Sequence, residues 1–238
     1  MKVVVTGGAS GVGKAITRRL AQEPSDFVYF TFNSSQESAA EIEREFSNTR
    51  AFRLDFNSLE SIDSFVRQLP GLAPDVLVNN AITGYSEAHF HKMDPAVFEK
   101  SFRSNVCPII RITQQFIVES RKRKSGRIIT ILSSALINRP PVGWSEYTAN
   151  KAYLHSMVKS WAVENAAFGI TSNSISPSFM QTRLTSKTDS RLVESMIADN
   201  PNTRLLSEGE VTDVVMFFMK STSHLNGHNL VINAARDV

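Results

Sequence analysis

A tyrosine and a lysine four residues apart, Tyr147 and Lys151, are the side chains of this sequence that best combine for acid–base chemistry. On a helix this spacing places both side chains on one face. A nearby cation stabilises a phenolate, so we expect Lys151 to lower the tyrosine pKa from about 10 toward the working pH. Alcohol–ketone chemistry needs such a general acid/base, and Ser134 could hydrogen bond with the substrate oxygen. The alternative is a surface tyrosine and lysine on an amphipathic helix.

A glycine-rich segment, Thr6 to Gly13, follows an apolar run at residues 3–5 and precedes a helical pattern carried by Ala15, Ile16 and Leu20. Glycines at a turn from strand to helix let the backbone approach a pyrophosphate held at the helix N-terminus. Tight turns also need glycine for purely steric reasons. The strand–loop–helix context favours a dinucleotide site.

The elements that must position these residues show apolar periodicity that alternates between strand and helix. Further strands are predicted at residues 27–32, 51–54, 76–78, 128–132, 171–175 and 230–232. Helices are predicted at residues 37–46, 59–69, 96–120, 145–168 and 210–220. The alternation predicts an α/β fold with a parallel sheet. We expect a single domain over residues 1–238, with a polar, irregular insert at about 176–205 that closes over substrate.

The composition argues against several other classes of protein. Lys and Arg are interspersed with Asp and Glu and the net charge is +3, so we expect no nucleic-acid partner. The basic run at 121–124 is interpreted as a solvated helix end. His89 and His91 have no third ligand in view, which argues against a metal site. A single cysteine, Cys107, fits a reducing compartment, and the N-terminal apolar run is too short for a signal peptide or membrane span; we expect a cytoplasmic location.

Six motifs, in their order and spacing, resemble the classical short-chain dehydrogenase/reductase family, and within it the 3-oxoacyl-acyl-carrier-protein reductases. The motifs are Thr6-Gly-x-x-x-Gly11-x-Gly13, Asn79-Asn80-Ala81, Asn105, Ser134, Tyr147-x-x-x-Lys151 and Pro177 to Thr182. The resemblance covers nearly the whole chain. It implies a three-layer, doubly wound Rossmann fold with a central, mostly parallel seven-stranded sheet flanked by helices.

The resemblance also implies a role for each site residue. Tyr147 would be the catalytic acid/base, Lys151 would also hold the nicotinamide ribose, Ser134 would orient the carbonyl, and Asn105 would anchor a proton-relay water. Asp55 would accept a hydrogen bond from the adenine amino group, the alternative being a helix N-cap or turn acid. The implied cofactor-binding residues are Gly7, Ser10, Gly11, Val12, Gly13, Asn33, Ser34, Ser35, Asp55, Phe56, Asn80, Ala81, Tyr147, Lys151, Pro177 and Thr182.

The choice of cofactor depends on the end of the second strand, where a carboxylate would bind the ribose of NAD and repel the 2′-phosphate of NADP. This chain has Asn33-Ser34-Ser35 there instead, which favours NADP(H), with NAD(H) as the alternative. Ser10 stands where many NADP-dependent relatives carry a basic residue. The other interpretation of 33–35 is a loop that caps the next helix.

Three departures from the family pattern are visible. Ile82 stands where glycine usually follows Asn-Asn-Ala, Ser178 replaces the glycine after Pro177, and Asn233-Ala234-Ala235 replaces Asp-Gly-Gly. The first two add side chains near the expected cleft and could narrow it. The third puts the contacts of the C-terminal strand, and with them a tetramer interface, in doubt.

The sequence therefore predicts an NADPH-dependent reductase of a ketone, with a 3-oxoacyl thioester or similar apolar carbonyl as substrate. One alternative is an NAD-dependent alcohol, steroid or sugar dehydrogenase, and another is a non-catalytic dinucleotide-binding regulator. The resemblance implies a homotetramer or homodimer. An acyl carrier protein is a further candidate partner, because Arg127 matches one of two basic positions expected at the cleft mouth; the other is Phe168 here.

Overall fold

Seven parallel strands form the central sheet of the computed structural model, which describes residues 1–137, 139–182, 184–186 and 188–236. Their order is β3-β2-β1-β4-β5-β6-β7, which confirms the predicted seven-stranded sheet. The strands are β1 Lys2–Val5, β2 Phe27–Phe32, β3 Thr49–Arg53, β4 Val76–Asn79, β5 Gly126–Ile131, β6 Ile170–Pro177 and β7 Asn229–Ile232. All six neighbouring pairs run parallel.

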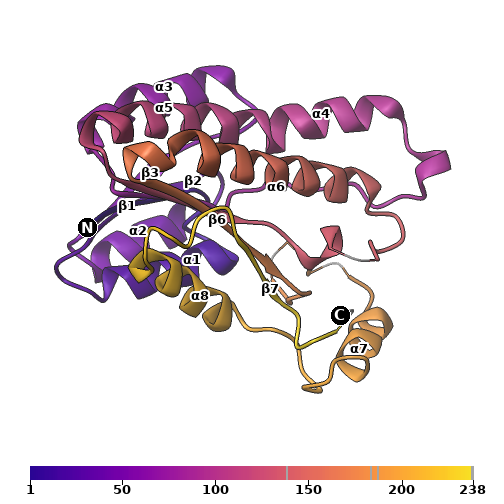
Figure 1. Ribbon diagram of the computed structural model, residues 1–238. Coiled ribbons are helices and arrows are strands. Elements are labelled where there is room, and N and C mark those ends of the chain that lie inside the picture. The colour runs from indigo at the N-terminus through magenta and orange to yellow at the C-terminus, as the bar shows by residue number, and fades with distance from the viewer. Residues whose placement is uncertain (138, 183, 187, 237–238) are drawn as a thin grey trace.

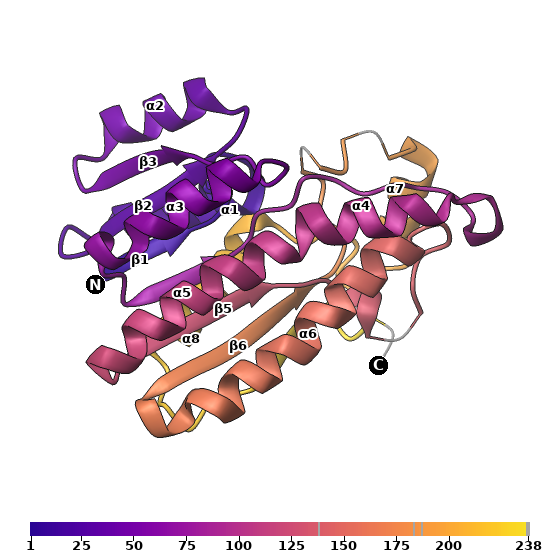
Figure 2. The same cartoon turned by 90° about the horizontal axis from the view of Figure 1, so that it is seen from above.

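Helices cover both faces of the sheet, as Figures 1 and 2 show. One face carries α1 Gly11–Ala21, α2 Gln36–Glu45 and α8 Glu208–Lys220, and the other carries α3 Leu59–Leu72, α5 Cys107–Arg123 and α6 Ser145–Asn165. Successive side chains of a strand point to opposite faces. Val3 and Val5 therefore join the first hydrophobic core and Val4 joins the second. This arrangement is the predicted three-layer Rossmann fold.

The strand order reverses at β1, which pairs with β2 on one side and β4 on the other. Val5 lies opposite Phe30 of β2 and Val78 of β4. The loops that leave β1 and β4 therefore diverge to opposite faces. In open parallel sheets, a crevice for ligands forms at the carboxyl ends of the strands at this point.

The helix predicted at 96–120 is two helices in the structure, α4 Pro95–Asn105 and α5. Pro108 has no backbone N–H and cannot donate to the carbonyl of Ser104, so the ladder is interrupted there. The insert predicted as irregular contains α7, Ser190–Ala198. The described residues also form three short 3-10 helices. These are η1 Phe90–Lys92, η2 Ser134–Leu136 and η3 Ala166–Phe168.

Side chains of the basic run at 121–124 contact other residues of the protein. The Arg121 guanidinium donates to Asn165 Oδ1 at 2.7 Å and lies 4.4 Å from the centre of the Phe168 ring. Lys122 pairs with Glu119 of the same helix. Within the described part of the chain, no helix is long and apolar enough to cross a membrane. Among the described residues, no group of three or more His, Cys, Asp or Glu side chains could hold a metal ion.

Candidate active site

A cleft of about 760 Å³ opens at the carboxyl ends of the strands, where loops after β1, β2, β4, β5 and β6 converge. The predicted site residues that line it are Gly7, Ser10, Gly11, Val12, Asn33, Ser34, Ser35, Phe56, Asn80, Ala81, Ser134, Tyr147, Lys151, Pro177 and Thr182. Three predicted residues do not line it: Gly13, Asp55 and Asn105. Sequence segments more than 150 residues apart are thus brought into one site.

The glycine loop is shaped for close approach of a ligand. Gly7 and Gly11 have φ angles of +68° and +51°, in the left-handed region that favours glycine. Gly13 has a different role, because a Cβ there would lie 2.2 Å from the Gly7 carbonyl oxygen and 2.5 Å from Asn80 Nδ2. Gly13 does not line the cleft, and it allows α1 to pack against the loop; its predicted contact with the cofactor stays a prediction.

Asn80 ties the loop after β4 to the glycine loop. Its side chain donates to the Thr6 carbonyl at 2.9 Å, and its backbone N–H donates to the Thr6 hydroxyl at 2.9 Å. The backbone N–H of Ala81 donates to the same hydroxyl at 3.1 Å. These bonds hold both walls of the dinucleotide end of the cleft in one arrangement.

The segments that follow β2 and β3 carry different polar side chains. Asn33, Ser34 and Ser35 line the cleft after β2, and this loop contributes no carboxylate. After β3, the Asp55 carboxylate accepts from the backbone N–H of Asn57 at 2.9 Å and does not line the cleft. This contact agrees with the alternative interpretation of Asp55 as a turn acid, and its predicted bond to adenine stays a prediction. Asn57, which the sequence analysis missed, lines the cleft beside Phe56.

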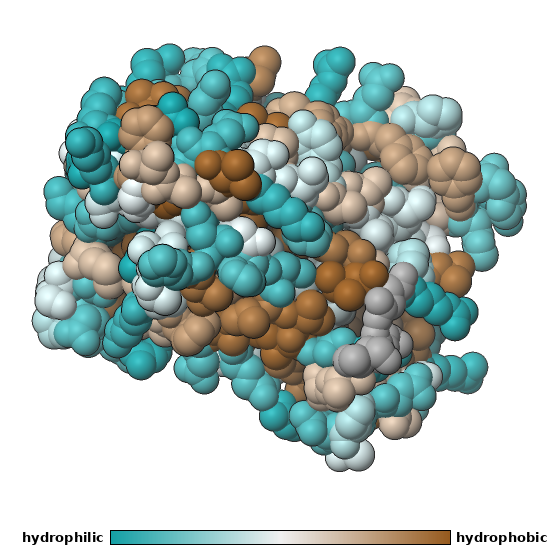
Figure 3. All heavy atoms as spheres, viewed as in Figure 1, coloured by the Kyte–Doolittle hydropathy of each residue, from teal (hydrophilic) through white to brown (hydrophobic). Residues whose placement is uncertain are grey.

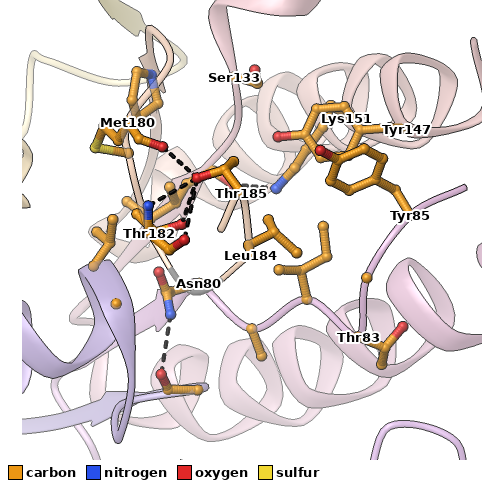
Figure 4. A pocket seen from close by; sticks show the side chains of 18 of the residues that line it. Asn80, Thr83, Tyr85, Ser133, Tyr147, Lys151, Met180, Thr182, Leu184 and Thr185 are labelled. Atoms are coloured by element: carbon orange, nitrogen blue, oxygen red, sulfur yellow. Dashed lines mark hydrogen bonds between the residues drawn. The ribbon is translucent and has the colours of Figure 1, made fainter. Parts of the chain in front are cut away.

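Tyr147 and Lys151 lie in the first two turns of α6, as their spacing predicted, and both face the cleft (Figure 4). The Lys151 ammonium lies 5.8 Å from the centre of the Tyr147 ring and donates to the Ile131 carbonyl at 2.8 Å. The serine that hydrogen bonds with Tyr147 is Ser133. Ser134, which the sequence analysis predicted to orient the substrate carbonyl, also lines the cleft, and that role stays a prediction.

The two adjacent serines differ because the backbone turns between them. β5 ends at Ile131, and Ser133 caps η2 by accepting a hydrogen bond from the backbone N–H of Ala135 at 3.2 Å. Ser134 is already the first residue of η2. The turn leaves Ser134 on the cleft wall without a hydrogen bond to Tyr147, and only the tertiary structure distinguishes the two.

Burial controls the proton affinities of the pair. It raises the pKa of Tyr147 to about 12, although the Ser133 hydrogen bond acts in the opposite direction. It lowers the pKa of the Lys151 ammonium to about 8. The expectation that Lys151 brings the Tyr147 pKa down toward neutrality is therefore wrong for the protein's own groups, because desolvation of the phenolate outweighs the nearby amine. Tyr147 is a neutral phenol at neutral pH.

Two aromatic side chains, Tyr85 and Trp144, lie beside the Tyr147 ring. The Tyr85 ring lies 5.2 Å from the Tyr147 ring, and Trp144 lies 4.8 Å from Tyr85 and 5.5 Å from Tyr147, centre to centre. Figure 4 shows Tyr85 beside Tyr147 and Lys151 at the substrate end of the cleft. The sequence analysis did not place Tyr85 in the site, because no motif marks it.

The insert supplies the apolar wall that faces these rings. Phe179, Met180, Leu184 and Met196 line the cleft, whereas Leu192 is 43% exposed and does not. Thr185 accepts from the backbone N–H of Thr182 at 2.8 Å and donates to the Met180 carbonyl, which stabilises the loop (Figure 4). Two of the insert's residues, Arg183 and Lys187, lie outside the described residues.

The departures from the family pattern have separate consequences. Ile82 and Ser178 line the cleft, and neither adopts a positive φ, so both add bulk without backbone strain. Ala234 and Ala235 have φ angles of +55° and +61°, which cost more for alanine than for the glycines they replace.

The family model described as short chain dehydrogenase matches residues 1–192. This chain belongs to the short-chain dehydrogenase family. It is 31% identical over 242 residues to an acetoacetyl-CoA reductase of Allochromatium vinosum, with 97% of this chain and 96% of that protein covered. It is 28% identical to a 3-oxoacyl-acyl-carrier-protein reductase of Buchnera aphidicola, covering 96% and 94%.

Solved structures agree with this short-chain dehydrogenase in fold. A short-chain dehydrogenase/reductase family protein superposes with a TM-score of 0.86 at 28% identity, covering 98% of this chain and 96% of that one. An actinorhodin polyketide ketoreductase solved with NADPH gives 0.88 at 22% identity, covering 100% and 97%. The protein is an oxidoreductase that acts on carbonyl or hydroxyl groups.

Proposed function

We propose that this short-chain dehydrogenase reduces a ketone to an alcohol with NADPH, and that its substrate is a 3-oxoacyl thioester or a similar apolar carbonyl compound. The observation that carries the proposal is the state of Tyr147. Its phenol is buried, hydrogen bonded with Ser133 and protonated at neutral pH, and it faces a cleft large enough for a dinucleotide and an acyl chain. A positioned neutral phenol is a proton donor, which suits the reductive direction.

Each residue of the site would have a separate role in the reaction. Gly7 and Gly11 leave room for a pyrophosphate at the start of α1, where the helix dipole favours negative charge. Bound NADPH would supply the hydride to the carbonyl carbon. Ser133 and Tyr147 would both bind the carbonyl oxygen, and Tyr147 would give its proton to that oxygen as negative charge develops there. Lys151 would hold the ribose and stabilise the resulting phenolate.

The residues after β2 support NADPH over NADH. Asn33, Ser34 and Ser35 offer amide and hydroxyl donors to a 2′-phosphate. Glu87 is the one carboxylate among the described residues that line the cleft, and it lies beside Gly143 on the substrate side. The cleft-lining residues that directly follow β2, Asn33 to Ser35, thus include no carboxylate that would repel the phosphate.

An acyl thioester as substrate is supported by the relatives and by the chemistry of the cleft. The names of two relatives specify acetoacetyl-CoA and 3-oxoacyl-acyl-carrier-protein as their substrates. The apolar wall suits an acyl chain, and the guanidinium groups of Arg139 and Arg236 line the cleft, where they could bind phosphates of the carrier. Arg127 donates to the Phe218 carbonyl, which gives it a structural role, so docking of an acyl carrier protein rests on the relatives.

Exposed apolar side chains support assembly into a dimer or tetramer. Figure 3 shows apolar surface around α8 and β7, where Phe217 is 53% exposed and Leu230 and Val231 are each 38% exposed. A second group lies on α5 and α6, where Val118 and Val163 are exposed. An open edge strand with apolar side chains commonly pairs with another chain. We propose a homotetramer or homodimer in the cytoplasm, and elution as a monomer at micromolar concentration would contradict the assembly.

The test follows the absorbance of NADPH, and in parallel of NADH, with acetoacetyl-CoA and with an uncharged ketone. We expect faster turnover with NADPH and a fall in kcat of about 10² or more in Tyr147→Phe. Tyr153→Phe is the matched control, because Tyr153 is 42% exposed on the same helix. Turnover only with NAD and an alcohol would favour the dehydrogenase alternative, and tight NADPH binding without turnover of any ketone would favour the regulator.

A further inference from the structure

A buried carboxyl group, Glu146, directly precedes Tyr147 on α6 and is not used by the proposed chemistry. Its side chain is 1% exposed. Within the described part of the chain, no ion pair includes it. A buried carboxylate without a cation costs several kcal/mol unless hydrogen bonds satisfy its oxygens. The contacts of Glu146 therefore indicate what this side chain does.

Glu146 joins three separate segments of the chain. One oxygen accepts from the backbone N–H of Ser86, in the loop after β4, at 3.1 Å. The other accepts from Asn150 Nδ2 on α6 at 3.1 Å and from the Ser101 hydroxyl on α4. All three partners are donors, so the group they surround must accept throughout, as an ionised carboxylate does.

Ser101 extends this link to Asn105. The Ser101 oxygen accepts from Asn105 Nδ2 at 3.1 Å and from Asn150 Nδ2 at 2.8 Å. Both amide nitrogens are donors, so the only proton of Ser101 is directed to Glu146. Asn105 Oδ1 accepts from the backbone N–H and the hydroxyl of Thr83 at 2.8 and 2.9 Å, and Thr83 itself lines the main cleft (Figure 4).

The network encloses a small cavity behind the catalytic pair. The cavity has a volume of about 10 Å³, which is close to the space that one water molecule needs. Its polar and ionisable walls are Asn105, Glu146, Tyr147, Asn150 and Lys151. A buried water requires two to four polar partners, and these five side chains carry the polar atoms from which such partners would come. Tyr147 and Lys151 also line the main cleft, so the cavity and the cleft share them.

We propose that Glu146 is a positioning residue that fixes Asn105 and Asn150 around this cavity, and that it thereby holds in place the proton-relay water that the family resemblance assigns to Asn105. The inference rests on the proposed ketone reduction. Each reduction removes one proton from the Tyr147 hydroxyl. One proton passes from the Lys151 ammonium to the phenolate, and the cavity water replaces it with a proton that ultimately comes from solvent, so both groups recover their starting states.

Glu146→Gln tests the proposal in the full-length protein. The amide keeps the size of the carboxyl group. Its NH2 group, however, would face either the Ser86 N–H or the donors of Asn150 and Ser101, so that one donor would point at another. We expect kcat to fall at least about tenfold, with the KM for NADPH little changed. The solvent isotope effect on kcat should rise, and the isotope effect from 4-deuterated NADPH should fall, because proton return becomes slower than hydride transfer. Glu164→Gln replaces an exposed carboxylate at the other end of α6 and should match the wild type.

Ser101→Ala is the second variant, because it removes the link from Glu146 to Asn105 and keeps the carboxylate. It should change both isotope effects in the same directions as Glu146→Gln. This second variant keeps the proposal testable if Glu146→Gln does not fold. A lower kcat with both isotope effects unchanged in either folded variant would mean a purely structural role and would overturn the inference alone. No ketone reduction by the wild type, or full activity of Tyr147→Phe, would overturn the proposed function and this inference together.

Discussion

Replacing Lys151 with methionine should abolish catalysis and still make the folded protein more stable at neutral pH. Lys151 is 8% exposed, and burial lowers its pKa from 10.5 to about 8. The unfolded chain therefore takes up this proton below pH 10.5, whereas the folded protein takes it up only below about pH 8. Stability decreases as the pH falls between these values, and the full cost is present below about pH 8.

The magnitude follows from the two pKa values. The fall from 10.5 to about 8 corresponds to about 3 kcal/mol. Loss of the hydrogen bond from Nζ to the Ile131 carbonyl offsets about 1 kcal/mol of this gain. Methionine fills most of the same space. Lys151→Met should therefore raise the free energy of unfolding by about 2 kcal/mol at pH 7, and the gain should disappear as the pH approaches 10.5.

Urea unfolding of the two proteins between pH 7 and pH 10 measures this difference. Lys159→Met is the matched control, since Lys159 is an exposed lysine further along α6, and its effect should stay within about 0.5 kcal/mol. A Lys151→Met protein that is less stable than wild type at pH 7 would refute the argument. So would a gain of the same size at every pH, because desolvation of the ammonium must titrate.

Three further substitutions test the geometry of the site. Ser133→Ala should lower kcat by about 10², while Ser134→Ala stays within a few-fold; the reverse order in steady-state kinetics would restore Ser134 as the catalytic serine. Gly13→Ala should cost at least about 2 kcal/mol in urea unfolding, whereas Gly71→Ala, where a Cβ meets nothing within 4 Å, should be neutral or stabilising. Ala234→Gly should raise the melting temperature by about 2–4 °C, and a lower value would contradict the strain assigned to its φ of +55°.

The order of strands and helices was predictable because it depends on local periodicity. β2 has the predicted bounds, and each of the other strands differs from its predicted range by one or two residues at one or both ends. The break between α4 and α5 was missed because the apolar spacing continues across Pro108 while the hydrogen-bond ladder does not. The helix α7 within the insert was missed although its apolar residues Leu192, Val193, Met196 and Ile197 recur at helical spacing, because it spans only nine residues within a long polar stretch.

The sequence by itself determined the family, the fold, the glycine loop and the Tyr147–Lys151 pair, because each depends on residue types at short, fixed spacings. Only the tertiary structure decided which serine contacts Tyr147. Ser133 and Ser134 are adjacent residues of the same type, and only the turn of the backbone between them directs their side chains differently. The tertiary structure also decided the protonation of Tyr147, since burial depends on side chains such as Tyr85 that approach from a distant loop. Proton affinity depends on the surroundings that folding creates, and no spacing along the chain specifies them.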